Sequence, residues 1–213
     1  MTKTDTTTMP LYLQQTLLEN GYQLSSETQQ QLFAFLELMH KWNRVFNLTA
    51  IRDFKESILL HILDSLSVAK YLHGENIIDV GSGAGLPGIP LALMYPDKTF
   101  VLLDSNNKKT RFLTQAVFEL KIKNVSVEHA RVEDFKPIKT FDSIITRAFA
   151  NIKVMLETTQ HLLAEDGQFL AMKGVYPEAE LKDIPAQFNV LAVHKLIIKG
   201  LLAERHLVCV KRI

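Results

Sequence analysis

The chain has 213 residues, of which 47% are hydrophobic and 22% are charged, and its formal net charge at pH 7 is +1. This length accommodates one core-forming domain with an appendage, and the composition is typical of a soluble globular protein. A dedicated phosphate-binding protein is usually more basic, so any surface for nucleic acid must be local. The single cysteine, Cys209, excludes a disulfide framework and a cysteine-rich metal site. Its apolar neighbours predict a position in the core.

The ten N-terminal residues, MTKTDTTTMP, are polar and lack the apolar centre of a signal peptide. No apolar run approaches the ~20 residues that a membrane span requires. We therefore expect a cytoplasmic protein with no membrane partner and no bound metal, and we expect it to be a monomer.

Helical patterns fill the N-terminal third of the chain. A short helix is expected from Pro10 to Asn20, and a longer one starts at Ser25 or Ser26, where Ser26 and Gln29 match a capping box. An apolar stripe at helical spacing continues along the second helix. Trp42, beside this stripe, is expected to pack on the main domain rather than to stack on a base.

A third helix is expected from Asp53, which forms a capping box with Glu56, to about Leu72. His61 and Asp64 lie within one turn of each other on this helix. A metal site would require more ligands than one histidine and one aspartate. The favoured interpretation is a hydrogen-bonded helix face without a functional site.

The stretch from Asn76 to Pro90, NIIDVGSGAGLPGIP, combines a short buried strand, a glycine-rich loop and the start of a helix. Glycine tolerates positive φ and lets the backbone approach a ligand closely. A helix N-terminus after such a loop is a site for a nucleotide-like ligand. A tight turn without a ligand is the structural alternative.

Two ligand classes fit this loop. Gly83, Gly85 and Gly88 match the dinucleotide fingerprint GxGxxG. Read from Gly81, the loop instead resembles the first motif of class I S-adenosylmethionine (SAM) methyltransferases, with the acidic Asp79 near the amino-acid end of the cofactor. We favour this second interpretation because Gly81 directly follows the strand. In the dinucleotide interpretation, Pro87 would lie at the pyrophosphate turn and would remove an N–H donor there.

From residue 76 onward strands and helices alternate, as in a mostly parallel sheet with helices on both faces. We predict a Rossmann-like α/β fold of the class I SAM-dependent methyltransferase type, with a seven-stranded, mostly parallel sheet. Residues 76–213 are expected to form this domain, and residues 1–75 a helical extension packed on it. A turn is expected at residues 165–167, before the fifth strand. Strands are expected at 76–80, 100–103, 125–129, 141–146 and 168–172, followed by an antiparallel pair at 190–198 and 206–211.

Acidic residues near the ends of the next two strands are candidates for cofactor binding. Asp104 ends the second strand, where a carboxylate can accept hydrogen bonds from both ribose hydroxyls. A turn or helix cap at residues 104–106 would explain Asp104 without a ligand. In methyltransferase sheets the loop after the third strand borders the adenine, so Val132 and Glu133 are candidates for binding the edge of the base.

Several cations are expected around the same cleft. Lys108 and Arg111 lie in the first turns of a helix, where the helix dipole disfavours positive charge. Arg205 lies in a loop with a basic rim. Arg147 follows the fourth strand, which neighbours the first in this topology, so we expect it to project into the same cleft as Gly81. Alternatively, Lys108 and Arg111 would lie on an ordinary solvated surface with no role in binding.

Several runs of the chain form a specific set: HILDSL from His61, IIDVGSGAGLPGIPL, LLDS, RVEDF, TRAFA, MKG and ERHLV. In this order they resemble the ribosomal RNA small subunit methyltransferase G family, also called glucose-inhibited division protein B. The resemblance covers roughly residues 43–210, and GLPGIP together with RAFA is specific to this family. Leu60 stands where the family more often has arginine.

The resemblance implies methyl transfer from SAM to N7 of a guanine in small-subunit (16S) ribosomal RNA. Guanine N7 has an in-plane lone pair and no proton, so it needs no general base, and positioning supplies much of the acceleration. The resemblance also implies that Arg147 contacts the cofactor, and we expect it to be the catalytic residue. Further expected cofactor contacts, from the resemblance or from the loop and strand pattern, are Gly81, Gly83, Leu86, Asp104, Val132 and Glu133.

We expect Lys108, Arg111 and Arg205 to bind phosphates of the ribosomal RNA. Two other functions remain compatible with the residues. One is a SAM-dependent methyltransferase that acts on a small molecule or a protein, and the other is a non-catalytic nucleotide-binding module.

Overall fold

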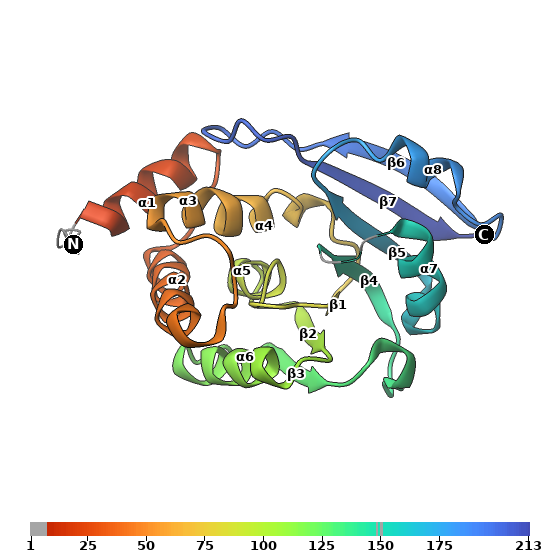
Figure 1. Cartoon of the computed structure of the whole chain (residues 1–213), viewed down its shortest axis with the longest axis horizontal. Helices are drawn as coiled ribbons and strands as arrows, with labels where there is room; N and C mark the ends of the chain where they lie inside the picture. The colour runs from red at the N-terminus through yellow and green to blue at the C-terminus, as the bar shows by residue number, and fades with distance from the viewer. Residues whose placement is uncertain (1–7, 148, 150) are drawn as a thin grey trace.

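The computed structural model describes residues 8–147, 149 and 151–213, and it is built around a seven-stranded sheet with the order β3-β2-β1-β4-β5-β7-β6 (Figure 1). The first five strands are parallel, and β7 runs antiparallel to both of its neighbours, β5 and β6. The predicted seven-stranded, mostly parallel sheet is therefore confirmed. Its strands are β1 (Asn76–Val80), β2 (Thr99–Asp104), β3 (Val125–His129), β4 (Phe141–Thr146), β5 (Leu163–Lys173), β6 (Phe188–Lys195) and β7 (His206–Arg212).

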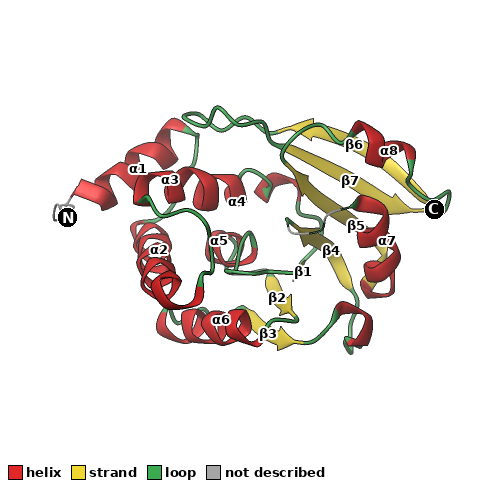
Figure 2. Cartoon of the chain, viewed as in Figure 1, coloured by secondary structure: helices red, strands yellow, loops and turns green. Residues whose placement is uncertain are grey.

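Helices cover both faces of the sheet, as Figure 2 shows. On one face lie α5 (Gly88–Met94) and α6 (Asn107–Glu119), and on the other α7 (Ile152–Thr159), followed by α8 (Glu178–Lys182). The buried side chains form two clusters, and successive residues of β1 alternate between them, Ile77 in one and Ile78 in the other. Because both faces are covered, the central strands β1 and β2 are buried along most of their length.

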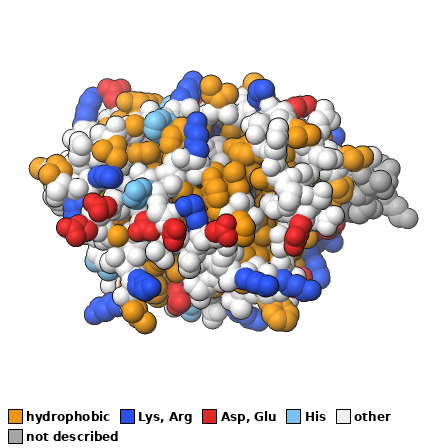
Figure 3. Space-filling view, turned by 180° about the vertical axis from the view of Figure 1, so that it is seen from behind, with side chains coloured by type: hydrophobic (Ala, Val, Ile, Leu, Met, Phe, Trp, Pro, Cys, Tyr) orange, Lys and Arg blue, Asp and Glu red, His pale blue; other side chains and the backbone are white. Residues whose placement is uncertain are grey.

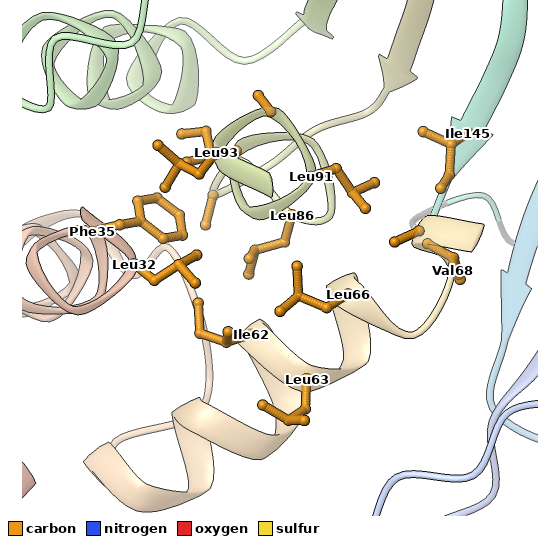
Figure 4. Close-up of a cluster of buried hydrophobic side chains, with 14 of the residues drawn as sticks. Leu32, Phe35, Ile62, Leu63, Leu66, Val68, Leu86, Leu91, Leu93 and Ile145 are labelled. Carbon is orange, nitrogen blue, oxygen red and sulfur yellow. The ribbon is translucent and has the colours of Figure 1, made fainter. Parts of the chain in front are cut away.

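The N-terminal helices share a core with α5. They are α1 (Thr8–Glu19), α2 (Ser26–Phe46), α3 (Phe54–Ser57) and α4 (Asp64–Leu66), with a π-helical turn at Ile58–Leu63 and a 3-10 turn at Ala69–Tyr71. Figure 4 shows one group of buried side chains that includes Phe35 of α2 and Leu66 of α4. Leu86, just before α5, and Leu91, within α5, belong to the same group. Among the described residues, no helix has the length and apolar character needed to cross a membrane.

Two helix predictions are corrected in detail. The second helix is capped by Ser25, whose Oγ accepts a hydrogen bond from the N–H of Thr28 at 3.1 Å, rather than by Ser26. Asp53 caps the third helix as predicted, with a 2.8 Å bond from the N–H of Glu56. This helix does not continue regularly to Leu72, because it widens into the π-helical turn before Asp64.

The turn predicted at residues 165–167 is also wrong, because β5 runs through it. The pairing of β4 with β5 shifts register between Phe141 and Ser143, so the extra residues form an irregularity within the strand. Gly167 is required there: a Cβ atom would lie 2.8 Å from Leu163 Cδ1 and 3.0 Å from the carbonyl oxygen of Phe141. Glycine in this position indicated close packing rather than a turn.

Two side chains with potential functional roles belong to the packing of the protein. Trp42 makes an edge-on contact with Phe112 of α6 and stacks on Phe46, at centroid distances of 5.6 and 5.1 Å. Cys209 is buried in β7, and burial raises the pKa of its thiol to about 11. Both predictions of packing are confirmed.

Candidate cofactor and substrate site

The glycine loop after β1 is held against the neighbouring strand. Gly81, Gly83 and Gly85 have φ values of 73°, 60° and 82°, which L side chains rarely adopt. The N–H groups of Gly81 and Ser82 donate to the carbonyl oxygen of Leu103 in β2, at 2.8 and 3.2 Å. A Cβ atom on Gly83 would meet only Gly81 O and Lys109 Nζ, at 3.8 and 4.0 Å. The backbone at Gly83 is therefore open to a ligand.

Asp104 connects this loop to the end of β2. Its Oδ2 accepts a 2.8 Å hydrogen bond from the N–H of Gly83, and its Oδ1 accepts one of 2.8 Å from the N–H of Asn106. Asn106 in turn caps α6. The carboxylate thus has the turn-forming role that needs no ligand, and its oxygens retain further lone pairs for a hydroxyl donor.

A cavity of about 220 Å³ opens at the carboxyl ends of β1 and β2. Four predicted residues line it together: Gly81, Asp104, Val132 and Glu133. The sequence interpretation missed Phe149, which also lines this cavity. A cavity lined by an aromatic residue, a carboxylate and a glycine backbone suits a flat base attached to a ribose.

Leu86 does not line this cavity with its side chain. Only 2% of the residue is exposed, and Figure 4 shows the side chain directed into the core near Leu66. Any contact of Leu86 with a ligand would therefore involve its backbone.

Asp79 lies beneath the loop and is completely buried. Its Oδ2 accepts a 2.9 Å hydrogen bond from the N–H of Gly88, while its Oδ1 has no partner among the described residues. Burial raises the pKa of this carboxyl to about 7, and the charge of Arg147 opposes the increase. The unpartnered oxygen beneath the glycine loop is a candidate acceptor for a cationic group.

Arg147 lines a second cavity, of about 370 Å³, rather than the first one. Its Nη1 donates to the carbonyl oxygen of Leu60 at 3.2 Å and to Asp64 Oδ2 at 3.3 Å. These contacts direct the guanidinium group towards the N-terminal helices, although its charge still acts on Asp79. The prediction that Arg147 shares a cleft with Gly81 needs this correction: the two residues line separate cavities. Two alanines of the RAFA motif, at 148 and 150, lie outside the described residues.

Arg205 lies in the second cavity too, apart from the other predicted phosphate-binding residues. Its Nε donates to Asp64 Oδ1 at 3.0 Å, and only 22% of its side chain is exposed. Lys108 and Arg111 are exposed in the first turns of α6. The structure thus separates the predicted basic rim into an ion-paired arginine and two exposed surface cations.

Charged side chains are mixed elsewhere on the surface. On the face seen in Figure 3, acidic and basic side chains are scattered among hydrophobic and uncharged ones. Among the residues that the structure describes, no three histidine, cysteine, aspartate or glutamate side chains are grouped to hold a metal ion.

His61 and Asp64, assigned from the sequence to a helix face, both line the second cavity. His61 Nε2 lies 3.0 Å from Thr49 Oγ1. Burial and the nearby Arg147 lower the pKa of this histidine to about 4, so it is neutral at pH 7. In the sequence, only the run HILDSL marks His61 and Asp64 as candidate site residues, because the residues that they contact come from other segments of the chain.

The parallel sheet with an antiparallel β7 between β5 and β6, and the cavity beside the glycine loop, define a class I SAM-dependent methyltransferase. Solved structures share this fold. A SAM-dependent methyltransferase from Aquifex aeolicus has a TM-score of 0.58 and 20% identity, covering 74% of this chain and 93% of that one. The glycopeptide N-methyltransferase MtfA, complexed with SAM, has a TM-score of 0.62 and 10% identity, covering 72% and 87%.

The model of the rRNA small subunit methyltransferase G family matches residues 28–208. Relatives named ribosomal RNA small subunit methyltransferase G include one from Pseudomonas aeruginosa, 48% identical over 195 residues and 91% of each chain. Another, from Photobacterium profundum, is 48% identical over 196 residues, 92% of this chain and 95% of that one. The chain belongs to the rRNA small subunit methyltransferase G family, and its methyl donor is SAM.

Proposed function

We propose that this enzyme transfers a methyl group from SAM to N7 of a guanine in 16S ribosomal RNA. The observation that carries the proposal is a cavity lined by three basic side chains, Arg147, Lys173 and Arg205, while Phe149, two residues after Arg147, lines the cavity of the glycine loop. An RNA substrate brings phosphates and a guanine, and arginine pairs with both. The relatives' names point to the same substrate.

The residues present fit SAM at the first cavity. Asp104 would accept hydrogen bonds from the ribose, Val132 and Glu133 would border the adenine, and Gly81 and Gly83 would allow close approach of the backbone. Asp79, with its unpartnered oxygen, suits the cationic amino-acid end. When bound, SAM supplies an electrophilic methyl group on a sulfonium centre.

Guanine N7 is the acceptor that best matches the side chains available. Its lone pair needs no deprotonation, so the protein has only to orient the base and exclude water. The buried Cys209, with its pKa raised to about 11, is not available as the nucleophile that carbon methylation would use. Arg147 would contact the RNA beside the target base, and it cannot pair with N7 while N7 is methylated.

We further propose that the enzyme works as a cytoplasmic monomer without a metal ion. Residues 76–213 would carry the donor site, with residues 1–75 as a helical extension. His61 and Asp64 would make that extension one wall of the substrate cavity.

The direct test is incubation of the purified protein with methyl-labelled SAM and either 30S subunits or protein-free 16S RNA. Mass spectrometry of ribonuclease fragments should then find a single 7-methylguanine. Label in a protein or small molecule of a cell extract, and none in RNA, would favour the other methyltransferase function. Saturable binding of NAD but not of SAM, by calorimetry, would favour a nucleotide-binding module.

Asp104→Ala is expected to weaken SAM binding by about 1–3 kcal/mol, roughly 5- to 150-fold in Kd. The change removes an acceptor for the ribose and frees the N–H of Gly83, which Asp104 now holds at 2.8 Å. Calorimetric titration with SAM measures the effect. Asp142→Ala is a matched control, because Asp142 accepts backbone N–H bonds from Glu75 and Asn76 at the opposite end of β1. Equal SAM affinities for both variants and the wild type would contradict the role of Asp104.

Replacing Lys108 and Arg111 together by alanine is expected to weaken RNA binding and reduce its salt dependence. Each phosphate contact contributes about one to the slope of log K against log[salt], so the slope should fall by roughly two. Filter binding between low and moderate salt measures it. Lys121→Ala with Lys123→Ala removes the same charge near the other end of α6, where both side chains are exposed, and should leave the slope unchanged. Identical slopes in both pairs of variants would remove Lys108 and Arg111 from the RNA interface.

A further inference from the structure

Asp64 is a buried carboxylate that faces two arginines. Only 2% of the residue is exposed. Its Oδ1 lies 3.0 Å from Nε of Arg205, and its Oδ2 lies 3.3 Å from Nη1 of Arg147. The two arginines come from separate parts of the sheet, one following β4 and the other preceding β7. A single side chain of the N-terminal helices therefore connects two strand ends.

The backbone around Asp64 is fixed by packing. Ile62, Leu63 and Leu66 are buried in the core, and Figure 4 shows Ile62 and Leu66 in the group that also includes Leu86. The hydroxyl of Ser65 donates to the carbonyl oxygen of His61. With its neighbours held on both sides, the Asp64 carboxylate has little freedom to follow the arginines. The arginines must instead adopt the positions that Asp64 sets.

Both arginines keep unused donors after binding Asp64. In the described part of the chain, Arg147 donates only through Nη1, to Leu60 and Asp64. Arg205 donates through Nε to Asp64 and through Nη1 to the carbonyl oxygen of Glu204. Nε and Nη2 of Arg147 and Nη2 of Arg205 are left, and both side chains line the 370 Å³ cavity, 30% and 22% exposed.

The charges at this wall do not cancel. One carboxylate faces two guanidinium groups, while Lys173, in the same cavity, is paired with Glu180 at 2.8 Å. The Asp64 cluster, defined as Asp64, Arg147 and Arg205, therefore has a net positive charge and free N–H donors. An arrangement of this kind binds an anionic oxygen group such as a phosphate.

From this geometry we infer that Asp64 is a positioning residue, which holds Arg147 and Arg205 together so that both engage one backbone phosphate of the RNA beside the target guanine. The inference rests on the proposed function. Asp64 does not contact the substrate itself. It fixes the planes of two guanidinium groups, which would otherwise sample many rotamers at a cost in binding.

A purely stabilising role is the competing explanation, and it makes different predictions. Buried ion pairs often contribute little net stability, because desolvation offsets the attraction. The arginines here are partly exposed, so removing Asp64 leaves no fully buried charge behind. Asp64→Ala and Asp64→Asn should therefore fold, and thermal unfolding checks this directly.

The test is a double-mutant cycle on methyl transfer to 30S subunits at saturating SAM. Asp64→Asn is expected to lower kcat/KM for RNA about 10- to 100-fold, mainly through KM, with SAM affinity within about threefold of the wild type. In a background of Arg147→Ala with Arg205→Ala, the same change should have less than a twofold further effect, because Asp64 acts only through those arginines. Equal, additive losses in both backgrounds would overturn the inference.

Two further measurements separate the possible failures. Glu204→Gln breaks the exposed Lys195–Glu204 pair, at 2.9 Å, next to Arg205, and should leave kcat/KM unchanged. A loss equal to that of Asp64→Asn would reject the specific role of Asp64.

NMR spectra of the arginine Nε–H groups test the contact independently of activity. Asp64→Asn should shift the signal of Arg205, and an unmoved signal would count against the inference. If the wild type methylates no RNA, the proposed function fails, whereas additive losses in an active enzyme reject only the role of Asp64.

Discussion

Replacing Arg147 by alanine is expected to slow methyl transfer about a thousandfold, a loss of roughly 4 kcal/mol in transition-state stabilisation. The guanidinium group lies at the wall of the substrate cavity, and its charge reaches Asp79 below the glycine loop. Among the described residues, Arg147 is the arginine whose charge lowers the pKa of Asp79. Because the reaction at N7 depends on positioning, loss of the group that orients the reactants removes most of the acceleration.

Single-turnover kinetics with 30S subunits measure the effect, and thermal unfolding controls for stability. With 30% of its side chain exposed, Arg147 contributes little to the core, so the variant should remain folded. Arg147→Lys keeps the charge but loses the planar fork and should still be slowed.

The wild-type rate should be independent of pH where histidines and carboxylates titrate, apart from effects on stability. A normal rate for Arg147→Ala would contradict the positioning role of Arg147, and a bell-shaped profile centred near the pKa of histidine would contradict a mechanism without a base.

Replacing Asp79 by asparagine is expected to change how the stability of the ligand-free protein depends on pH. Burial raises the pKa of Asp79 from 3.8 to about 7, so the folded protein binds a proton that the unfolded chain has lost between these values. Stability from this group is therefore present below pH 4 and is lost as the pH rises towards 7. Asparagine keeps an acceptor for the N–H of Gly88 and does not titrate.

Between pH 4 and pH 8, the unfolding free energy of Asp79→Asn should rise relative to that of the wild type by on the order of 4 kcal/mol. Urea unfolding of both proteins across this range measures it. His61, whose pKa is lowered to about 4, produces the opposite trend, but it is present in both proteins and cancels. Parallel stability curves would show that Asp79 is ionised throughout. Bound SAM should reduce the difference by giving the carboxylate a cationic partner.

The amino-acid sequence alone determined the elements whose signals are local. β1, β3 and β4 begin and end at the predicted residues, because each is a short run of residues that favour strands, bounded by polar or turn-forming residues. The glycine loop and the acidic end of β2 follow the same logic. Their spacing requires that Gly81 and Asp104 meet at the carboxyl edge of a parallel sheet, where one cavity now includes both.

Only the tertiary structure decided which charges are free. Asp64 meets Arg147 and Arg205 across 83 and 141 residues of sequence, and no local pattern in the chain encodes either pairing. Without those contacts, Arg205 was indistinguishable from Lys108 and Arg111, and Asp64 was one more polar residue on a helix. Ion pairing depends on distance in space and on burial, which is why the sequence could name the cations of the site but could not sort them.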